Sequence, residues 1–180
     1  LPGTDAKAIA QDLFWGAFIN TGQTCAAMKR LYVHDSVYDD VVDALAEIAE
    51  QTPMGPGLDE KNGLGPVQNK DQFDIVSHLV DDAVAHGGRV VTGGEAAPEL
   101  GELFYRARIV ADAFARANAA EVGLGASVWS SDPAEAARHA TRMQSGTVWV
   151  NSHGGLHPMV PFGGVKGSGY GLEFGVEGLK

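Results

Sequence analysis

The sequence predicts an α/β fold with a largely parallel sheet. Helical and strand-like segments alternate along the 180 residues, and such alternation is typical of sheets whose strands are joined through helices. Neither an internal repeat nor a low-complexity tract interrupts the alternation. A chain of this length can bury one sizeable core or two small ones.

The first part of the chain predicts two amphipathic helices on either side of the only cysteine. Residues 5–20 place apolar side chains at helical spacing, which favours a buried helix. We expect a short helical turn opening at Cys25 and then a strand over residues 30–34. Ser36 is expected to cap a further helix over residues 37–51, whose apolar positions again fit one face.

A loop rich in glycine and proline separates these segments from the remainder. Residues 52–66 hold three prolines and four glycines, a composition typical of loops. After it we expect, in order, a helix over 70–86, a strand over 89–92, a strand over 103–111, a helical segment over 113–120, a strand over 127–130, a helix from Pro133, a strand over 146–150 and an irregular tail over 152–171.

The composition excludes several classes of function. The net charge is −10 and the pI about 4.9, and the 13 basic residues form no block, so binding to nucleic acid or an anionic lipid surface is not expected. A single cysteine cannot form an internal disulfide, which favours a reducing compartment, and we expect the cytoplasm. Neither a membrane-spanning run nor a signal peptide is visible, and the first residue is Leu1, which suggests a piece of something longer.

Cys25 admits two interpretations. A free cysteine is often a small buried hydrophobe. Alternatively, a cysteine that follows a Gly-Gln-Thr turn and opens a helix is a candidate nucleophile, because the helix dipole and unpaired N–H groups favour the thiolate. Spacing alone leaves both interpretations open.

Other candidate motifs fail the tests for specific sites. The segment PFGGVKGSGYG, residues 161–171, lacks both the glycine spacing of a dinucleotide fingerprint and the Gly-Lys-Ser/Thr of a P-loop. His153 and His157 are four residues apart, but glycines and a proline argue against a helix there, and no further ligand completes a metal set. We therefore expect no metal.

Several segments, taken in order, resemble the catalytic domain of the NAD(P)-dependent aldehyde dehydrogenase superfamily. They are FINTGQTC, RLYVHDSVYDDVV, MGPGLDEKNGLGPVQNKDQF, GGRVVTGGE, ARANAAEVGLGASVWSSD, SGTVWVNSH and PFGGVKGSGYGLEFGVEGL. The resemblance covers nearly the whole chain, and the Gly-Gln-Thr-Cys and Pro-Phe-Gly-Gly-x-Lys-x-Ser-Gly segments are its most specific parts. It implies a three-layer open, largely parallel sheet with helices on both faces.

The resemblance also implies a site. Cys25 stands at the position of the family's nucleophile, which attacks an aldehyde to give a thiohemiacetal and, after oxidation with NAD or NADP, a thioester that water hydrolyses. The Cys25 N–H would be one donor to the oxyanion. Asn151 matches an asparagine near the substrate tunnel. The positions that match the tunnel lining are Ile19, Thr24, Leu156 and Phe162; beside them, Gly163 and Gly164 would let the chain turn tightly.

Parts of the family pattern are missing. The chain begins after the nucleotide-binding domain and the glutamate base of relatives, and it stops before the strand through which relatives pair subunits. The Glu-x-Phe-Gly-Pro segment that should follow RIVAD is absent, so we expect residues 1–180 to be one catalytic domain, a fragment or an incomplete part of a larger protein, with an internal deletion near residues 112–113.

The sequence therefore predicts an enzyme that, in its complete form, oxidises a small-molecule aldehyde to a carboxylic acid with NAD or NADP. Its partners would be a second copy in a homo-oligomer or the missing parts of the enzyme. If the 180 residues were the whole polypeptide, we would expect no NAD-dependent turnover. The alternatives are a non-catalytic α/β module that retains Cys25, acting structurally or by binding, and a thioesterase-like activity, which lacks a visible base.

Overall fold

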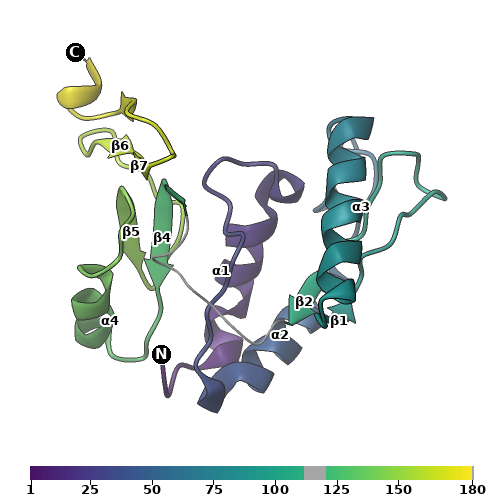
Figure 1. Ribbon diagram of the computed structural model, residues 1–180, viewed down its shortest axis with the longest axis horizontal. Helices are drawn as coiled ribbons and strands as arrows, with labels where there is room; N and C mark the ends of the chain where they lie inside the picture. Colours follow the sequence, from purple (N-terminus) through teal and green to yellow (C-terminus); the bar gives the residue numbers. More distant parts are fainter. Residues whose placement is uncertain (112–120, 180) are drawn as a thin grey trace.

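The computed structural model describes residues 1–111 and 121–179 (Figure 1). The α-helices are α1 (Ala6–Phe18), α2 (Tyr38–Gln51), α3 (Lys70–Ala85) and α4 (Pro133–Ala140); the 3-10 helices are η1 (Ile19–Gly22), η2 (Asp35–Val37) and η4 (Glu177–Leu179). The strands are β1 (Arg89–Thr92), β2 (Ile109–Ala111), β3 (Val122–Gly123), β4 (Gly125–Val128), β5 (Thr147–Val150), β6 (Phe162–Gly163), β7 (Val165–Lys166) and β8 (Leu172–Glu173).

Side-chain caps fix where three of the helices begin. Asp5 accepts a bond from the N–H of Ala8 at α1, and Asn69 accepts one from the N–H of Gln72 at α3. At α4, Asp132 accepts from two backbone N–H groups and Pro133 occupies the first turn, where a missing N–H costs nothing. These caps confirm the predicted helices to within one or two residues.

The predicted cap of α2 is wrong. Ser36 lies inside η2, and its backbone N–H donates to Nδ1 of His34, 3.2 Å away. The residue before α2 is Val37, which offers no side-chain oxygen. Asp39 and Asp40 in the first turn favour the positive end of the helix dipole instead.

The core forms where α1 packs against α2. Phe14 is fully buried, stacks on Phe18 with ring centroids 4.8 Å apart, and meets the ring of Trp15 edge-on. The other buried members of this cluster are Ala6, Leu13, Val41, Leu45, Leu64 and Trp129. Full burial of one such large side chain contributes about 1.5–3 kcal/mol, so this cluster anchors the turn that follows α1.

The α/β class is confirmed, with the sheet divided into pairs of strands. β4 and β5 are parallel, with α4 between them in sequence, and their register runs from Gly125 opposite Thr147 to Val128 opposite Val150. The pairs β1–β2, β3–β7 and β6–β8 are antiparallel. Among the strands formed by residues 1–111 and 121–179, the parallel arrangement predicted from the alternation is therefore confined to β4–β5.

Two further predictions about local structure differ from what the chain does. Residues 30–34 form no strand; no other described segment is paired with their backbone, and a strand requires such a partner. The strand predicted over 103–111 is reduced to β2, preceded by an isolated bridge between Ala96 and Tyr105. The helix predicted over residues 113–120 lies outside the described residues.

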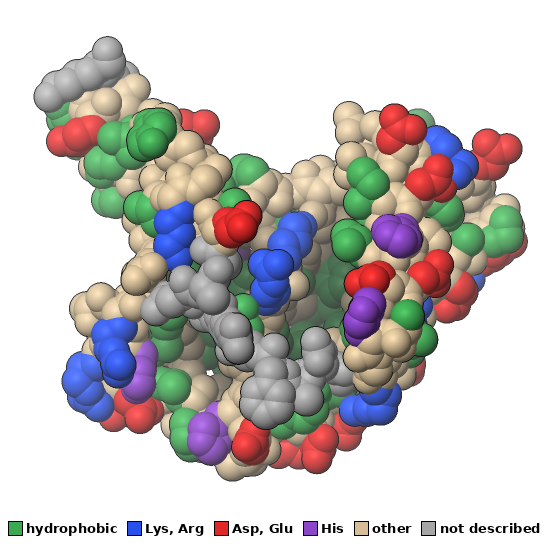
Figure 2. Space-filling view, in the orientation of Figure 1, with side chains coloured by type: hydrophobic (Ala, Val, Ile, Leu, Met, Phe, Trp, Pro, Cys, Tyr) green, Lys and Arg blue, Asp and Glu red, His purple; other side chains and the backbone are tan. Residues whose placement is uncertain are grey.

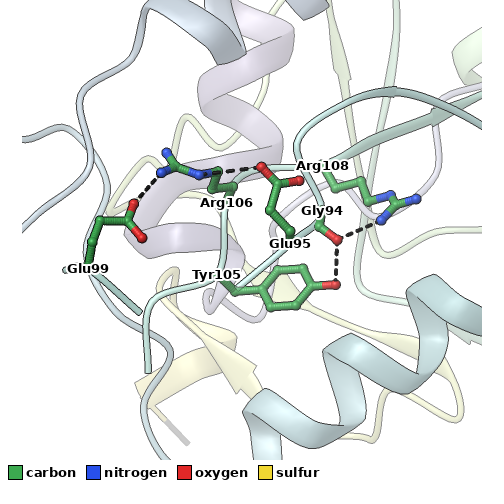
Figure 3. Close-up of polar contacts among 6 residues, drawn as sticks. All are labelled: Gly94, Glu95, Glu99, Tyr105, Arg106 and Arg108. Carbon is green, nitrogen blue, oxygen red and sulfur yellow. Dashed lines mark hydrogen bonds and ion pairs between the residues drawn. The ribbon is translucent and has the colours of Figure 1, made fainter. Parts of the chain in front are cut away.

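A polar cluster closes the connection between β1 and β2 (Figure 3). Tyr105 Oη donates to the carbonyl of Gly94 at 2.9 Å, and Arg108 donates to the same carbonyl at 2.7 Å. Arg106 forms ion pairs with Glu95 and Glu99. All three partners of these ion pairs are substantially exposed, so they contribute little, and the carbonyl of Gly94 is the anchor of the loop.

Candidate active site

Cys25 lies at the centre of a tight turn. The N–H of Ala27 donates to the carbonyl of Thr24 at 3.0 Å, which makes Cys25 and Ala26 the two central residues of a β-turn. The next N–H, that of Met28, donates to the carbonyl of Gly16 in α1 at 2.9 Å. Because that bond replaces a helical one, no helix begins at Cys25, and the prediction of a helical turn there is wrong.

The thiol is exposed and accessible. This exposure argues against the interpretation of Cys25 as a small buried hydrophobe. Because no helix begins at Cys25, a helix dipole cannot be the reason that its thiolate is favoured. What remains is a free thiol presented by a short turn whose flanking residues are held on several sides.

Side chains on the amino-terminal side of the turn hold it to the loop before α3. Gln23 donates from Nε2 to the carbonyl of Pro66 at 3.1 Å and accepts at Oε1 from the N–H of Gln68 at 2.7 Å. Thr21 Oγ1 accepts from the N–H of Gly65 at 3.0 Å. Thr21 also has a φ of 57°, a left-handed conformation that costs a β-branched residue about 1–2 kcal/mol. Sequence analysis assigns no separate role to Gln23 or Thr21.

Lys29 approaches the same segment from the other side. Its ammonium donates to the carbonyl of Gly22. Partial burial lowers the pKa of Lys29 below its ordinary value. A cation therefore lies close to the glycine that begins the Gly-Gln-Thr-Cys segment.

Within the turn, the carbonyl of Ala26 accepts from His153, whose Nε2 lies 2.8 Å away. Nδ1 of His153 lies 3.3 Å from Oγ of Ser127 in β4, and that oxygen accepts from Nε1 of Trp129 at 2.9 Å. Sequence analysis considers His153 only as a possible metal ligand. In residues 1–111 and 121–179, no group of three His, Cys, Asp or Glu side chains could hold a metal ion.

Contacts around Trp149 in β5 connect this network to other predicted site residues. The Trp149 ring lies 4.8 Å from that of His153 and 6.3 Å from that of buried Phe162. Trp149 Nε1 donates to the carbonyl of Gly155 at 2.7 Å, next to half-exposed Leu156. Phe162 is therefore linked to the Cys25 turn through Trp149 and His153, neither of which sequence analysis assigns to the site.

The remaining predicted residues differ in what their side chains contact. Thr24 is half-buried and its Oγ1 donates to the carbonyl of Ile19 at 3.4 Å, whereas Ile19 itself is half-exposed. The side-chain amide of Asn151 forms two hydrogen bonds with the backbone of Ser130, one through Oδ1 and one through Nδ2. Asn151 therefore supports the end of β5 with these two bonds, and its amide retains a second N–H and a second lone pair.

A cavity of about 740 Å³ opens beside the turn. Its walls are the chain from Cys25 to Val33 on one side and residues 122–129 on the other, with Leu13 and Val41 from the core behind. The thiol thus stands at the edge of a mostly apolar space.

Comparison with known proteins gives this geometry a context. The model of the aldehyde dehydrogenase family matches residues 1–113 and 103–180. The chain belongs to the aldehyde dehydrogenase family. It is 32% identical over 208 residues to phenylacetaldehyde dehydrogenase of Pseudomonas fluorescens, covering 100% of this chain and 41% of that protein.

Other relatives agree. A mitochondrial aldehyde dehydrogenase of Leishmania tarentolae is 36% identical over 199 residues, which cover 96% of this chain and 40% of that protein. The NAD+ complex of an aldehyde dehydrogenase from Bacillus cereus superposes with a TM-score of 0.91 at 29% identity, covering 99% of this chain and 42% of that one. The aldehyde dehydrogenase catalytic-domain fold is therefore confirmed, and the chain spans about two-fifths of the length of these relatives.

Proposed function

We propose that this chain forms the catalytic domain of an NAD(P)-dependent aldehyde dehydrogenase and that Cys25 is its nucleophile. The complete enzyme would oxidise an aldehyde to a carboxylic acid. One observation carries the proposal: in a member of this family, the only cysteine is exposed at the centre of a turn held by Gln23, Lys29 and His153.

Cys25 accounts for the first step and carries the acyl group that is released in the last. Cys25 Sγ bonds to the carbonyl carbon, the C=O double bond becomes a C–O single bond, and the oxygen carries the charge until it is protonated. The Cys25 N–H would be one donor to that oxygen. After two-electron oxidation the product is a Cys25 thioester, which water cleaves to the acid and the free thiol. The base for that water is not among the residues we assign.

The cofactor class that follows from the family is NAD or NADP, and it would supply the acceptor for the two electrons removed from the aldehyde. The glycine-rich segment at residues 161–171 does not fit a phosphate cradle. A Cβ on Gly163 would lie 2.7 Å from the Gly171 carbonyl oxygen, and one on Gly164 would lie 2.5 Å from Cβ of Ser168. This segment packs against itself, so it offers no cradle for the phosphates of the dinucleotide.

We also propose that residues 1–180 form one catalytic domain with an internal deletion near residues 112–113. Two findings support this. The family model matches in two stretches that overlap at residues 103–113, and the alignment with the Pseudomonas relative runs over 208 residues although the chain has 180. Relatives therefore hold more positions than this chain across the aligned region.

Association with further protein, either a second copy or the missing parts of the enzyme, is part of the proposal. Large apolar side chains are exposed along the carboxy-terminal segment, and Figure 2 shows them on the projecting lobe that carries β6 and β7; they are Met159, Val160, Leu172, Phe174 and Val176. Patches of this kind mark interaction surfaces. Sedimentation would detect the association as a mass above 18.8 kDa.

The cytoplasm remains our proposed location, because the only cysteine is a free thiol. Among the described helices, none combines the length and apolar character needed to cross a membrane.

The decisive experiment observes the covalent adduct. Phenylacetaldehyde labelled with ¹³C at its carbonyl is added to the purified chain, and carbon NMR is used to detect the thiohemiacetal carbon, which is distinct from both the free aldehyde and its hydrate. We expect this signal in the wild type and its loss in Cys25→Ala. A signal that persists in Cys25→Ala, or no signal in folded wild type at high aldehyde concentration, would overturn the assignment of Cys25.

A further inference from the structure

We propose that His153 is a positioning residue for Cys25: it holds the peptide that follows the nucleophile and thereby fixes the orientation of the turn. This inference rests on the proposed function of Cys25. It concerns a histidine that lies 127 positions from Ala26 in sequence and 2.8 Å from it in space.

Both polar atoms of the Ala26–Ala27 peptide are bound. Its N–H donates to the carbonyl of Thr24 at 3.0 Å, and its carbonyl accepts from His153 at 2.8 Å. A peptide held at both ends cannot rotate about its flanking bonds. Cys25 directly precedes it, so the direction in which the thiol is presented depends on this restraint.

The surroundings select one tautomer of His153. Nε2 faces a carbonyl, which only accepts, so Nε2 carries the hydrogen. In a neutral ring Nδ1 is then an acceptor, and it faces the Ser127 hydroxyl at 3.3 Å. That hydroxyl already accepts from Nε1 of Trp129, which leaves its own hydrogen free to point to His153 or to Sδ of Met28 at 3.5 Å. Every donor in this set has an acceptor without a buried charge.

Packing fixes the ring in this place. Trp149 lies against it with centroids 4.8 Å apart. On the other side, Gly16 leaves the space that His153 and Met28 use, because a Cβ there would lie 3.4 Å from Cδ2 of His153 and 2.3 Å from Cε of Met28. The ring thus lies between α1 and β5, and its hydrogen bond to the carbonyl of Ala26 reaches the turn that contains Cys25.

Asn151 brings His153 to this position. It has a φ of 49°, a left-handed conformation that asparagine tolerates better than most residues. This bend ends β5 and turns the chain so that the side chain two positions later lies beside Ser127.

The test uses Cys25 as its own reporter, since it is the only cysteine and its alkylation by iodoacetamide measures one site. We compare the second-order rate constant at neutral pH for the wild type, His153→Leu and His153→Gln. Leucine removes the donor, and glutamine retains an N–H at a similar reach. His157→Leu is the matched control, because His157 bonds to Met159 and not to the turn.

We expect His153→Leu to slow alkylation by about tenfold, the result if the released turn presents the thiol to the reagent in only about a tenth of the molecules. His153→Gln should restore most of the rate, and His157→Leu should leave it unchanged. Thermal unfolding and circular dichroism of each variant separate this effect from loss of the fold. Equal rates in folded His153→Leu and His157→Leu would overturn the proposal.

Ser127→Ala keeps the inference testable if His153→Leu does not fold. It removes the hydroxyl that faces Nδ1 and leaves the bond to Ala26 in place, so we expect a smaller slowing in the same direction. A Ser127→Ala rate equal to that of the wild type would count against the network. These outcomes are independent of the adduct experiment, in which failure of the thiohemiacetal signal would remove the assignment of Cys25 itself.

Discussion

Asn151 binds Ser130 with both atoms of its side-chain amide. Oδ1 accepts from the backbone N–H of Ser130, and Nδ2 donates to its carbonyl, each at 2.8 Å. The pair joins the chain just after β5 to the chain just after β4. The same asparagine holds a φ of 49°, so one residue supplies both the bend and the bonds that fix it.

Replacing Asn151 should therefore destabilise the fold. We expect Asn151→Ala to lower the free energy of unfolding by about 2–4 kcal/mol, since two hydrogen bonds are lost and alanine disfavours a left-handed backbone. Asn151→Gly tolerates the backbone and should cost only the hydrogen bonds, about 1–3 kcal/mol. Urea denaturation measures both. Equal losses in the two variants would show that backbone strain has no part in the effect.

Phe14 should be among the most sensitive positions in the core. It is fully buried in the α1–α2 interface, and truncation of such a phenylalanine typically costs about 3–5 kcal/mol. Leu58→Ala is the control, because Leu58 is fully exposed at 102% and should change stability by no more than about 0.5 kcal/mol. Similar losses in both variants, measured by urea denaturation, would mean that the core lies elsewhere.

The elements that the sequence predicted well are those with local signals. The spacing of Ile9, Leu13 and Phe14 predicts α1, and Pro133 predicts the start of α4; both signals lie within the element they specify. The wrong predictions depended on distant partners. Residues 30–34 have strand-forming side chains but lack a described partner, and Cys25 opens no helix because Met28 bonds to Gly16.

In the candidate site too, residues with a local sequence signal could be predicted, whereas residues that depend on distant partners could not. Cys25 could be found from its motif, because the Gly-Gln-Thr-Cys segment is contiguous. His153 could not, because its partners Ala26 and Ser127 are 127 and 26 positions away. A histidine followed by two glycines carries no local sign that its ring will reach a carbonyl in another segment. Asn151 was found by resemblance, but its contacts with Ser130 needed the structure.

Tyr105 gives a pH-dependent prediction. Its side chain is buried, and burial, as the largest cause, raises its pKa above the ordinary value of 10.0. The folded state therefore favours the neutral phenol more than the unfolded state does. The stabilisation this confers is complete below about pH 10, the unfolded value, and is lost as the pH rises through the folded value.

Tyr105→Phe tests this sign. The variant loses the 2.9 Å bond to Gly94, so we expect it to be less stable than the wild type by about 0.5–1.5 kcal/mol at neutral pH. Above about pH 10 the stability of the wild type should fall toward that of the variant, because only the wild type loses the phenol proton at this site. Other groups titrate in both proteins and cancel in the difference. A difference that grows with alkaline pH would contradict the predicted direction.

The glycine-rich segment allows the sharpest comparison of two chemically identical substitutions. Gly163 lies in β6 opposite Leu172, and a Cβ there would stand 2.3 Å from Leu172 Cδ2 and 2.7 Å from the Gly171 carbonyl oxygen. The leucine can move, but the carbonyl belongs to the backbone that leads into β8. The close approach of two backbones, not a turn with positive φ, is why glycine is needed at this position.

We therefore expect Gly163→Ala to destabilise the fold by about 1–3 kcal/mol, the usual cost of overpacking. Gly171→Ala places the same methyl group eight positions along the chain, where a Cβ would meet nothing within 4 Å and the φ lies outside the left-handed range. It should be neutral or stabilise by up to about 1 kcal/mol, because alanine reduces the freedom of the unfolded chain. Urea denaturation of the two variants gives the comparison directly. If both substitutions were neutral, β6 and β8 would not pack as closely in solution as they do here.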